Sequence, residues 1–471
     1  MLKARKVHFI GVGGYGMSAL AMVLKQQGTQ VSGSDVAASD RTRRLEAAGV
    51  EVHVGAHDAA HIDGAEVVVY STQVPQDNPE LVAARDRGLR VMHRSEVLAE
   101  FMGGQSIAVA GTHGKTTTSS MIAFLLERGG QDPTVLLGGE MEAIGGTGKA
   151  GSGPWVVAEA DESDRSFLRY HPEVAVVTNV EAEHLEFWEG SFERIQEGFR
   201  QFLSQVRPAG LAVLCADDPT LLSLGRELQA MPGGARVVFY GTHPAASWQA
   251  HNIRPWEKGI AYDCVRDGLL LGEVRLPIPG RHNALNSLGA LAAGSHAGLS
   301  FEQMQETLLS FGNAKRRFQV WAEVDGIRVV DDYAHHPTEI RATLAAAREQ
   351  AGRRVVAVFQ PQRYSRTHWL MDEFATAFQE ADVLVLTRIY SPPGEQPIPG
   401  VSAETLAARI TANTGRPVTL LSDPREILSF LRAEVRSGDT VLTMGAGDIW
   451  KVARDLAQEL KAQTPSARGQ G

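Results

Sequence analysis

Cysteine is nearly absent from this chain of 471 residues, which holds only Cys215 and Cys264. Two cysteines so far apart exclude a disulfide framework and a cysteine-rich metal site, and they fit a reducing compartment. The chain also lacks any apolar run near the roughly 20 residues that a membrane-spanning helix needs. Residues 7–10, VHFI, follow a basic start and run directly into a glycine turn. They predict a strand and not a signal peptide, so we expect a cytoplasmic protein without membrane insertion.

An excess of positive charge is lacking as well. The chain has 46 lysines and arginines against 55 aspartates and glutamates, a formal net charge of −9. This balance argues against broad nucleic-acid binding, and we expect no nucleic-acid partner. Any anionic ligand must therefore be held by local groups, such as loop amides, helix N-termini and single arginines.

At roughly 150 residues per domain, the length predicts about three domains. Short apolar runs alternate with helical patterns, which is typical of βαβ units and parallel sheets. Strands are expected within residues 7–12, 30–35, 65–71, 89–94, 106–111, 155–162, 174–180, 211–218, 235–241, 327–336, 354–362, 382–391, 417–423 and 439–449. A more antiparallel pattern covers residues 247–279, and helices are expected over residues 17–28 and 282–298.

The first glycine turn lies in residues 6–20, KVHFIGVGGYGMSAL. Gly11, Gly13 and Gly16 have the GxGxxG spacing after a predicted strand, and Asp35 stands near the end of the next one. This pattern alone predicts a dinucleotide site of the NAD type, with a pyrophosphate over the turn. An NAD-dependent oxidoreductase with an accessory ATPase-like domain is therefore one interpretation of the chain.

A second nucleotide loop follows in GTHGKTTT, residues 111–118. It comes after an apolar strand and before a helix, so backbone N–H groups and the helix dipole can face phosphates. Lys115 adds positive charge, and a threonine hydroxyl can bind Mg²⁺. Val109 stands where the strict Walker pattern has its first glycine, so the loop is a variant. We predict ATP binding here, with a purely structural turn as the alternative.

Carboxylates follow the next strands. Glu159, Asp161, Glu162 and Asp164 stand together in VVAEADESD. Ligands bind at this edge of a parallel sheet, although we expect two of the four only to form a solvated acidic turn. His184, in TNVEAEHLEFW, is a metal candidate beside the phosphate loop, with a structural histidine as the alternative. Mg²⁺ prefers oxygen ligands, so a single imidazole would be unusual.

The predicted fold class is α/β with three domains. They are a Rossmann-like N-terminal domain at residues 1–103, a central P-loop ATP-binding domain with a parallel sheet at residues 104–313, and a Rossmann-like C-terminal domain at residues 314–471. We expect a disordered tail from about residue 463 and a mobile glycine-rich loop at residues 138–153.

Ten motifs, in the same order along the chain, resemble those of the Mur ligases. They are GVGGYGMSALA, SGSD, AVAGTHGKTTT, EADESD, TNVEAEH, GRHNALNSLGA, RRF, DDYAHHPTEI, QRYSRT and GAGDI, and they cover nearly the whole length. The combination of DDYAHHPTEI with the AGTHGKT loop is the most specific part. Within the family, the motifs are most similar to those of the member that adds L-alanine to UDP-N-acetylmuramate.

The resemblance implies what each nucleotide loop binds. The N-terminal domain would hold the UDP part of a sugar nucleotide and not NAD, and the middle domain would bind ATP with Mg²⁺ (or Mn²⁺). The C-terminal domain would close over it with the amino acid. The implied reaction is ATP-driven amide formation through an acyl phosphate, the first peptide-forming step of peptidoglycan precursor synthesis.

The resemblance also assigns residues to each ligand. The UDP-sugar contacts would be Gly11, Gly13, Gly14, Gly16 and Met17, with Asp35, His57, Ser71 and Arg94 as further candidates. The ATP contacts would be Gly111, Thr112, His113, Gly114, Lys115, Thr116, Thr117, His282, Asn283, Asn286 and Asp332. The metal ligands would be Thr116, Glu159 and His184, and the amino-acid pocket would hold Arg363, Tyr364 and Arg366. The expected catalytic residues are Lys115, Glu159, His184, Arg317 and His335.

Structural alternatives remain for some of these residues. His57 also fits a surface loop, and an asparagine at the start of a helix also fits an N-cap. One of the two arginines, Arg363 or Arg366, could make only surface ion pairs.

Four features depart from the family pattern. Gln362 stands where relatives often have histidine, which leaves the preference for L-alanine open. Glu183 replaces the usual aspartate, and Tyr15 is bulky for its turn, where a ring pointing to solvent would fit. No lysine occurs between Lys149 and Lys258, so the carbamylated lysine of some relatives is absent.

Two further interpretations stay open beside the oxidoreductase. The nearest is the recycling ligase of the same superfamily, which joins a tripeptide to the same sugar nucleotide. The other is a non-catalytic sugar-nucleotide sensor that kept the fold. The expected partners are UDP-N-acetylmuramate and L-alanine, and the expected state is a monomer or a weak homodimer.

Overall fold

The computed structural model describes residues 4–350, 352–391 and 395–463. It divides into two compact units. The first comprises Met1–Ile253, Tyr262–Arg275 and Ala284–Ala314, and the second comprises Arg254–Ala261, Leu276–Asn283 and Lys315–Gly471. Of the tail that we expected to be disordered, Gln463 ends a helix and residues 464–471 lie outside the described residues. No helix among the described residues is long and apolar enough to cross a membrane.

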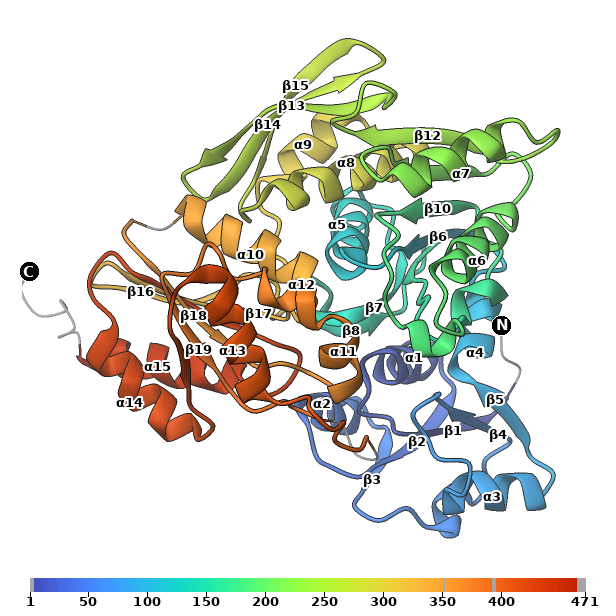
Figure 1. The fold of residues 1–471 in the computed structure, drawn as a ribbon. Helices are drawn as coiled ribbons and strands as arrows, with labels where there is room; N and C mark the ends of the chain where they lie inside the picture. The colour runs from blue at the N-terminus through green and yellow to red at the C-terminus, as the bar shows by residue number, and fades with distance from the viewer. Residues whose placement is uncertain (1–3, 351, 392–394, 464–471) are drawn as a thin grey trace, which may run out of the picture. The chain divides into compact units, whose positions relative to one another are not determined.

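The first sheet of the first unit has five parallel strands in the order β3-β2-β1-β4-β5 (Figure 1). The strands are β1 (Lys6–Ile10), β2 (Gln30–Asp35), β3 (Glu51–Val54), β4 (Val67–Tyr70) and β5 (Arg90–His93). The helices are α1 (Tyr15–Gln26), α2 (Asp40–Ala47), α3 (Pro79–Asp86) and α4 (Arg94–Phe101), with the 3₁₀ turn η1 (Ala59–Ile62). The strand order reverses between β1 and β4, so a ligand crevice is expected at their carboxyl ends.

The second sheet has ten strands in the order β15-β14-β13-β12-β11-β10-β6-β9-β7-β8. The strands are β6 (Gln105–Ala110), β7 (Thr134–Met141), β8 (Gly146–Lys149), β9 (Trp155–Glu159), β10 (Val174–Val177), β11 (Leu211–Cys215), β12 (Arg236–Gly241), β13 (Trp248–Trp256), β14 (Gly259–Arg266) and β15 (Leu269–Leu276). The helices are α5 (Lys115–Arg128), α6 (Phe192–Ser204), α7 (Pro219–Gln229), α8 (Arg281–His296) and α9 (Phe301–Leu308), with 3₁₀ turns η2 (Glu142–Ile144), η3 (Ser166–Arg169) and η4 (Leu185–Phe187). The buried parallel strands from β7 to β12 place the phosphate loop at a carboxyl edge.

The glycine-rich stretch 138–153 is not a loop, and this prediction was wrong. Strands β7 and β8 pair antiparallel through it. A Cβ atom on Gly139 would lie 2.8 Å from Cγ2 of Thr116, and one on Gly148 would lie 2.6 Å from the carbonyl oxygen of Ala19. These glycines therefore allow the hairpin to pack closely against neighbouring elements. A glycine-rich composition is also typical of mobile loops, so composition alone cannot tell the two cases apart.

The sheet of the second unit has six strands in the order β16-β17-β21-β18-β19-β20. The strands are β16 (Gln319–Val324), β17 (Ile327–Asp332), β18 (Val355–Phe359), β19 (Val383–Leu386), β20 (Val418–Leu420) and β21 (Thr440–Met444). The helices are α10 (Pro337–Gln350), α11 (Tyr364–Trp369), α12 (Met371–Ala375), α13 (Ala403–Thr414), α14 (Pro424–Glu434) and α15 (Trp450–Gln463). β16 pairs antiparallel with β17, and the remaining pairs are parallel.

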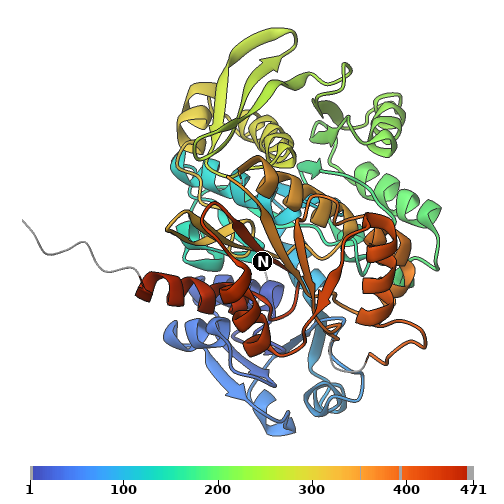
Figure 2. The ribbon, with the colours of Figure 1, turned by 60° about the vertical axis from the view of Figure 1, so that its left-hand side comes forward.

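Helices cover both faces of this sheet, as Figures 1 and 2 show. Alternate residues of β18 enter two separate cores, with Val355, Ala357 and Phe359 in one and Val356 and Val358 in the other. A strand that is apolar at every position is expected when both of its faces are buried.

Candidate active site

The phosphate loop leaves β6 at Ala110 and enters α5 at Lys115. Gly111 has φ +125°, and a Cβ atom there would lie 2.2 Å from Oγ1 of Thr178. Gly114 has φ +80°, and its Cβ atom would lie 2.7 Å from Oδ1 of Asn286. Only glycine fits either position, so the loop presents its backbone and the N-terminus of α5 without side chains in the way. Asn286, predicted as an ATP contact, lies beside this loop.

Lys115 is tied across its own loop. Its Nζ donates to the carbonyl oxygens of Gly111 at 2.5 Å and Thr112 at 3.1 Å, and to both carboxylate oxygens of Glu162 at 3.0 and 2.9 Å. Burial disfavours the charged ammonium, but the carboxylates of Glu162 and Asp161 outweigh it and raise the pKa of Lys115 above its usual value. The lysine is therefore a fixed positive charge at the mouth of the loop.

Thr116 and Glu159, two predicted metal ligands, lie together. The hydroxyl of Thr116 donates to Oε2 of Glu159 at 3.2 Å, and the backbone N–H of Gly138 donates to Oε1 at 2.6 Å. Ser119 donates to the same carboxylate at 3.3 Å. A hydroxyl beside a carboxylate is the kind of oxygen set that Mg²⁺ prefers, so these residues fit such an ion. Neither Ser119 nor Gly138 was singled out from the sequence.

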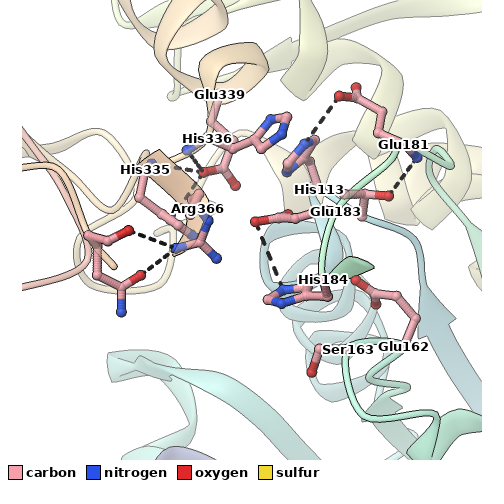
Figure 3. A network of polar contacts seen from close by, with 12 residues as sticks. His113, Glu162, Ser163, Glu181, Glu183, His184, His335, His336, Glu339 and Arg366 are labelled. Carbon is pink, nitrogen blue, oxygen red and sulfur yellow. Dashed lines mark hydrogen bonds and ion pairs between the residues drawn. The ribbon is translucent and has the colours of Figure 1, made fainter. Parts of the chain in front are cut away.

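His184 stands at the start of η4 with φ +55°, which is uncommon for a residue other than glycine. Its ring nitrogens lie 3.9 Å from carboxylate oxygens of Glu183 and Glu186, and Figure 3 marks the contact with Glu183. When protonated, the ring lowers the pKa of the carboxyl groups of Asp161 and Glu162. The structure thus places His184 next to the acidic loop.

Two of the four carboxylates, Glu162 and Asp164, are enclosed in the structure, whereas the side chain of Asp161 is 35% exposed. Glu162 is 4% exposed, and the side chain of Asp164 is 7% exposed. Lys115 compensates Glu162, while Arg94 contacts Asp161 at 2.8 Å and Asp164 at 3.4 Å. The sequence pattern could not reveal these partners because both cations come from other segments of the chain.

The threonine and histidine of the loop support it from within. The backbone N–H of His113 donates to Oδ1 of Asn179 at 2.8 Å, and the hydroxyl of Thr112 accepts from the N–H of Glu181 at 2.8 Å. The ring of His113 lies 3.6 Å from the carboxylate of Glu181, as drawn in Figure 3. Thr117 is buried in α5. Asn179 lies two residues after the buried strand β10, a signal that the sequence analysis did not use.

The first glycine turn is held by β2. The N–H groups of Gly11 and Val12 donate to the carbonyl oxygen of Ser34 at 2.8 and 2.9 Å. Oδ2 of Asp35 accepts from the N–H of Gly13 at 2.8 Å. The carboxylate of Asp35 therefore stabilises the glycine turn itself. In the NAD interpretation, the same carboxylate would instead bind a ribose. Gly14 is the N-cap of α1 without a side-chain cap, and Gly16 and Met17 lie in its first turn.

Tyr15 does not point freely to solvent. The guanidinium of Arg41 lies 4.0 Å from the centre of its ring, and Nε of Arg41 donates to the carbonyl oxygen of Gly13 at 2.5 Å. The bulky residue thus takes part in a cation–π contact that braces the turn.

His57, Ser71 and Arg94 follow strands β3, β4 and β5 of the first sheet, respectively. Nδ1 of His57 lies 2.9 Å from Oε1 of Glu80, a fully buried carboxylate that also accepts from Ser34 at 2.6 Å. Although burial opposes it, the hydrogen bonds to Glu80 hold the pKa of its carboxyl below the usual value. His57 is half-buried and contacts the Glu80 carboxylate. The surface-loop alternative for His57 does not account for this contact.

In the second unit, Asp332 is the last residue of β17, and His282 and Asn283 lie in the first turn of α8. Asp332 accepts from the N–H groups of Phe318 and Ala334, both at 2.7 Å, and burial raises its pKa to about 6. Burial lowers the pKa of His282 to about 4. Asn283 donates through Nδ2 to the carbonyl oxygen of Pro279 at 2.7 Å.

His335 and Arg317 lie around Tyr333. Nδ1 of His335 is 2.9 Å from the carbonyl oxygen of Tyr333 and 3.2 Å from Oε2 of Glu339, which lies in the first turn of α10 (Figure 3). The guanidinium of Arg317 lies 5.3 Å from the centre of the Tyr333 ring. Both predicted catalytic residues of this unit thus sit at the carboxyl edge of its sheet.

The predicted amino-acid pocket lies at α11. Arg363 has φ +70°, and Arg366 donates to Oε1 of Gln362 at 2.5 Å. Glu395 accepts from the N–H groups of Tyr364 and Ser365 at 3.2 and 3.1 Å. Glu395 was missed because it is far from these residues in the sequence and no local pattern marks it.

Three family models match successive parts of the chain. They are "Mur ligase family, catalytic domain" at residues 6–106, "Mur ligase middle domain" at residues 109–294 and "Mur ligase, glutamate ligase domain" at residues 316–447. The chain belongs to the Mur ligase family. The predicted family and the three-domain α/β fold class are thereby confirmed.

Two curated relatives are similar over nearly the whole of this Mur ligase. The UDP-N-acetylmuramate–L-alanine ligase of Symbiobacterium thermophilum is 84% identical over 463 residues, which are 98% of this chain and 96% of the relative. The enzyme of the same name from Pelotomaculum thermopropionicum is 48% identical over 462 residues, 98% of this chain and 99% of the relative.

Two solved structures share the fold over 98% of this Mur ligase. The UDP-N-acetylmuramate–alanine ligase of Thermotoga maritima has a TM-score of 0.83 and 28% identity, and all of that chain is covered. A murein peptide ligase of Psychrobacter arcticus has a TM-score of 0.71 and 25% identity, with 99% of that chain covered.

Proposed function

We propose that this Mur ligase joins L-alanine to the carboxylate of UDP-N-acetylmuramate at the expense of ATP. This is the first peptide-forming step of peptidoglycan precursor synthesis. The observation that carries the proposal is the 84% identity, over 98% of the chain, to a curated ligase of that name. The phosphate loop, with its charged lysine and adjacent hydroxyl–carboxylate pair, supplies the parts that such a reaction needs.

The sugar nucleotide would bind at the carboxyl edge of the first sheet, in a domain of residues 1–103. Its diphosphate would lie over the glycine turn at the N-terminus of α1, because backbone N–H groups and the helix dipole favour an anion there. The proposed contacts are Gly11, Gly13, Gly14, Gly16, Met17, Asp35, His57, Ser71 and Arg94. Asp35 would act through the shape of the turn, since its carboxylate already accepts from Gly13.

ATP would bind at the phosphate loop of a central domain, residues 104–313. The proposed contacts are those that the family resemblance assigns: Gly111, Thr112, His113, Gly114, Lys115, Thr116, Thr117, His282, Asn283, Asn286 and Asp332. Thr116, Glu159 and His184 would hold Mg²⁺ or Mn²⁺, which would neutralise phosphate charge when bound.

The chemistry has to bring two anions together. A carboxylate oxygen of the sugar nucleotide attacks the γ-phosphorus of ATP, so that an acyl phosphate forms and ADP leaves. The fixed ammonium of Lys115 offsets the negative charge that this step concentrates. The amine of L-alanine then attacks the acyl carbon, an amide bond forms and phosphate leaves.

The amino acid would be held by a C-terminal domain of residues 314–471. Arg363, Tyr364 and Arg366 are its proposed contacts, because an arginine fork suits a carboxylate. Arg317 and His335 are proposed to act at the phosphates and the active site. We further propose a cytoplasmic enzyme that is a monomer or a weak homodimer.

A recycling ligase for the tripeptide is the second candidate. The Thermotoga maritima L-alanine enzyme, with a TM-score of 0.83, resembles this chain more than the Psychrobacter arcticus murein peptide ligase does at 0.71. Together with the identity to the curated L-alanine ligases, this favours L-alanine as the amine substrate.

Phosphate release from ATP, with Mg²⁺ and UDP-N-acetylmuramate present, tests the proposal. One reaction receives L-alanine and the other receives L-Ala-γ-D-Glu-diaminopimelate. We expect release only with L-alanine. Release only with the tripeptide would make the enzyme a recycling ligase, and release with neither would favour a non-catalytic sensor.

A further inference from the structure

The loop that follows β9, residues 160–165, contacts both nucleotide-binding sheets of the first unit. On one side, Glu162 accepts two hydrogen bonds from Lys115 of the phosphate loop. On the other side, Asp161 and Asp164 contact side chains that follow β4 and β5 of the first sheet. One short segment thus links the place proposed for ATP to the place proposed for the sugar nucleotide.

Thr72, which follows β4, and Asp164, in the loop after β9, form a short hydrogen bond between the two sheets. The hydroxyl of Thr72 donates to Oδ2 of Asp164 at 2.6 Å, and the same oxygen of Asp164 lies 3.4 Å from Nη2 of Arg94. The hydroxyl has only one hydrogen, so its oxygen accepts from Nε2 of His93, 3.0 Å away. Burial lowers the pKa of His93, which fits this neutral ring.

Arg94 uses only one of its edges for these contacts. Nη2 donates to Asp161 at 2.8 Å and to Asp164 at 3.4 Å. Across the described part of the chain, no protein group accepts a hydrogen bond from Nη1 or Nε of Arg94. Nη1 lies 3.5 Å from the place where a Cβ atom would sit on Gly16, the last glycine of the first turn. The unused edge of the guanidinium therefore lies next to the glycine turn.

We propose that Thr72 and Asp164 are positioning residues that aim Arg94 at the anionic oxygens of the sugar nucleotide. The proposal rests on the function proposed above. A guanidinium whose Nη2 side is already held loses less freedom when its remaining donors bind a phosphate or carboxylate. Those oxygens belong either to the diphosphate over the glycine turn or to the carboxylate that ATP activates, and the chemistry of recognition is the same.

The same contacts connect the two substrates. Nη2 of Arg94 donates to Oδ2 of Asp161 at 2.8 Å. The next residue, Glu162, holds Lys115 directly. A sugar nucleotide that fixes Arg94 therefore also fixes the segment that orients the phosphate-loop lysine.

The test compares Thr72→Val with Thr72→Ser in the full-length enzyme. Thr72 is exposed, so neither substitution removes core packing. Valine deletes the hydroxyl that holds Asp164, and serine keeps it. We expect Thr72→Val to raise KM for UDP-N-acetylmuramate about tenfold, the effect of one lost hydrogen bond to a charged group. The value of kcat and the KM for L-alanine should change little, and Thr72→Ser should resemble the wild type.

A double variant separates positioning from a general effect on the fold. If Thr72 acts through Arg94, Thr72→Val adds no further loss of affinity in an Arg94→Ala background. Direct binding of UDP-N-acetylglucosamine, which lacks the carboxylate, identifies the oxygens involved. A matching loss for both sugar nucleotides places Arg94 on the diphosphate, and a loss for UDP-N-acetylmuramate alone places it on the carboxylate.

Wild-type affinity in Thr72→Val would overturn the inference, and so would a loss that adds fully to that of Arg94→Ala. Neither result touches the proposed function, which fails only if the wild-type enzyme shows no L-alanine-dependent phosphate release. Asp164→Asn provides a second variant, and we expect it to shift the same KM in the same direction.

Discussion

Nζ of Lys115 lies 2.9 Å from Oε2 of Glu162, whose side chain is 5% exposed, while that of Lys115 is 17% exposed. A buried ammonium is stable only when a carboxylate compensates it. The pair keeps the lysine charged and extended across the phosphate loop before any nucleotide arrives. ATP phosphates can then compete for an ammonium that is already in place.

Lys115→Ala should abolish phosphoryl transfer while sugar-nucleotide binding stays nearly intact. The reason is that the lysine belongs to the phosphate loop, whereas the first glycine turn lies on another sheet. Rapid-quench detection of the acyl phosphate and calorimetry with UDP-N-acetylmuramate measure the two properties. Collapse of sugar-nucleotide binding in a folded variant would contradict the assignment of the two sites.

Glu162→Gln should shift the alkaline limb of activity to lower pH. In the wild type, the carboxylates raise the pKa of Lys115, so the ammonium persists through the alkaline range. Without Glu162, burial dominates and the pKa of the lysine falls. A pH profile of kcat between pH 7 and pH 10 tests this, with Glu193→Gln on the exposed start of α6 as the control. Identical alkaline limbs would show that Glu162 does not set the charge.

The strands and loops were predictable where a local pattern carries the information. Apolar runs ending in glycine or carboxylate residues located β1, β6, β9 and β17. β3 (Glu51–Val54) was missed because it is short and partly exposed, so it has no apolar run. The β7–β8 hairpin was mistaken for a loop because its glycines serve contacts with distant residues such as Thr116 and Ala19.

The candidate site was predictable in its residues but not in its connections. Motif spacing pointed to Lys115, Glu159 and His184, whose types fit phosphate and metal chemistry. The partners Glu80 and Glu395 were missed because each acts on residues far away in sequence. Pairing across such distances depends on packing, which no single-sequence pattern encodes.

Gly139→Ala should weaken metal-dependent activity. The added Cβ atom would lie 2.8 Å from Cγ2 of Thr116, closer than carbon atoms normally approach, so the threonine hydroxyl has to move from Glu159. We expect the Mg²⁺ concentration for half-maximal rate to rise about tenfold, the equivalent of about 1.4 kcal/mol. Gly104→Ala is the matched control, because a Cβ atom there meets nothing within 4 Å. Equal Mg²⁺ dependence in both variants would contradict the prediction.

Asp332 and His282 should give opposing pH dependences of stability. Burial raises the pKa of Asp332 from 3.8 to about 6, so its contribution to stability is lost as pH rises through this window. Burial lowers the pKa of His282 from 6.5 to about 4, so its contribution is lost as pH falls through that window. Each shift corresponds to about 3 kcal/mol, and the two effects largely offset each other.

Single substitutions should uncover each effect. Between pH 4 and pH 6.5, the thermal unfolding midpoint of Asp332→Asn should rise with pH more steeply than that of the wild type. The midpoint of His282→Gln should rise less steeply, or fall. Differential scanning fluorimetry of the nucleotide-free protein gives both slopes. Three parallel curves would mean that neither group titrates differently in the folded and unfolded states.

Gln362→Leu should raise KM for L-alanine. Oε1 of Gln362 accepts from Nη1 of Arg366 at 2.5 Å, which fixes the guanidinium proposed to bind the amino-acid carboxylate. Leucine fills similar space without an acceptor, so Arg366 loses this restraint, and we expect KM to rise about fivefold to tenfold. The KM values for ATP and UDP-N-acetylmuramate should stay unchanged, because those ligands are assigned to other residues. A change in all three KM values would point to a general distortion of the enzyme, whereas no change would remove Gln362 from the amino-acid pocket.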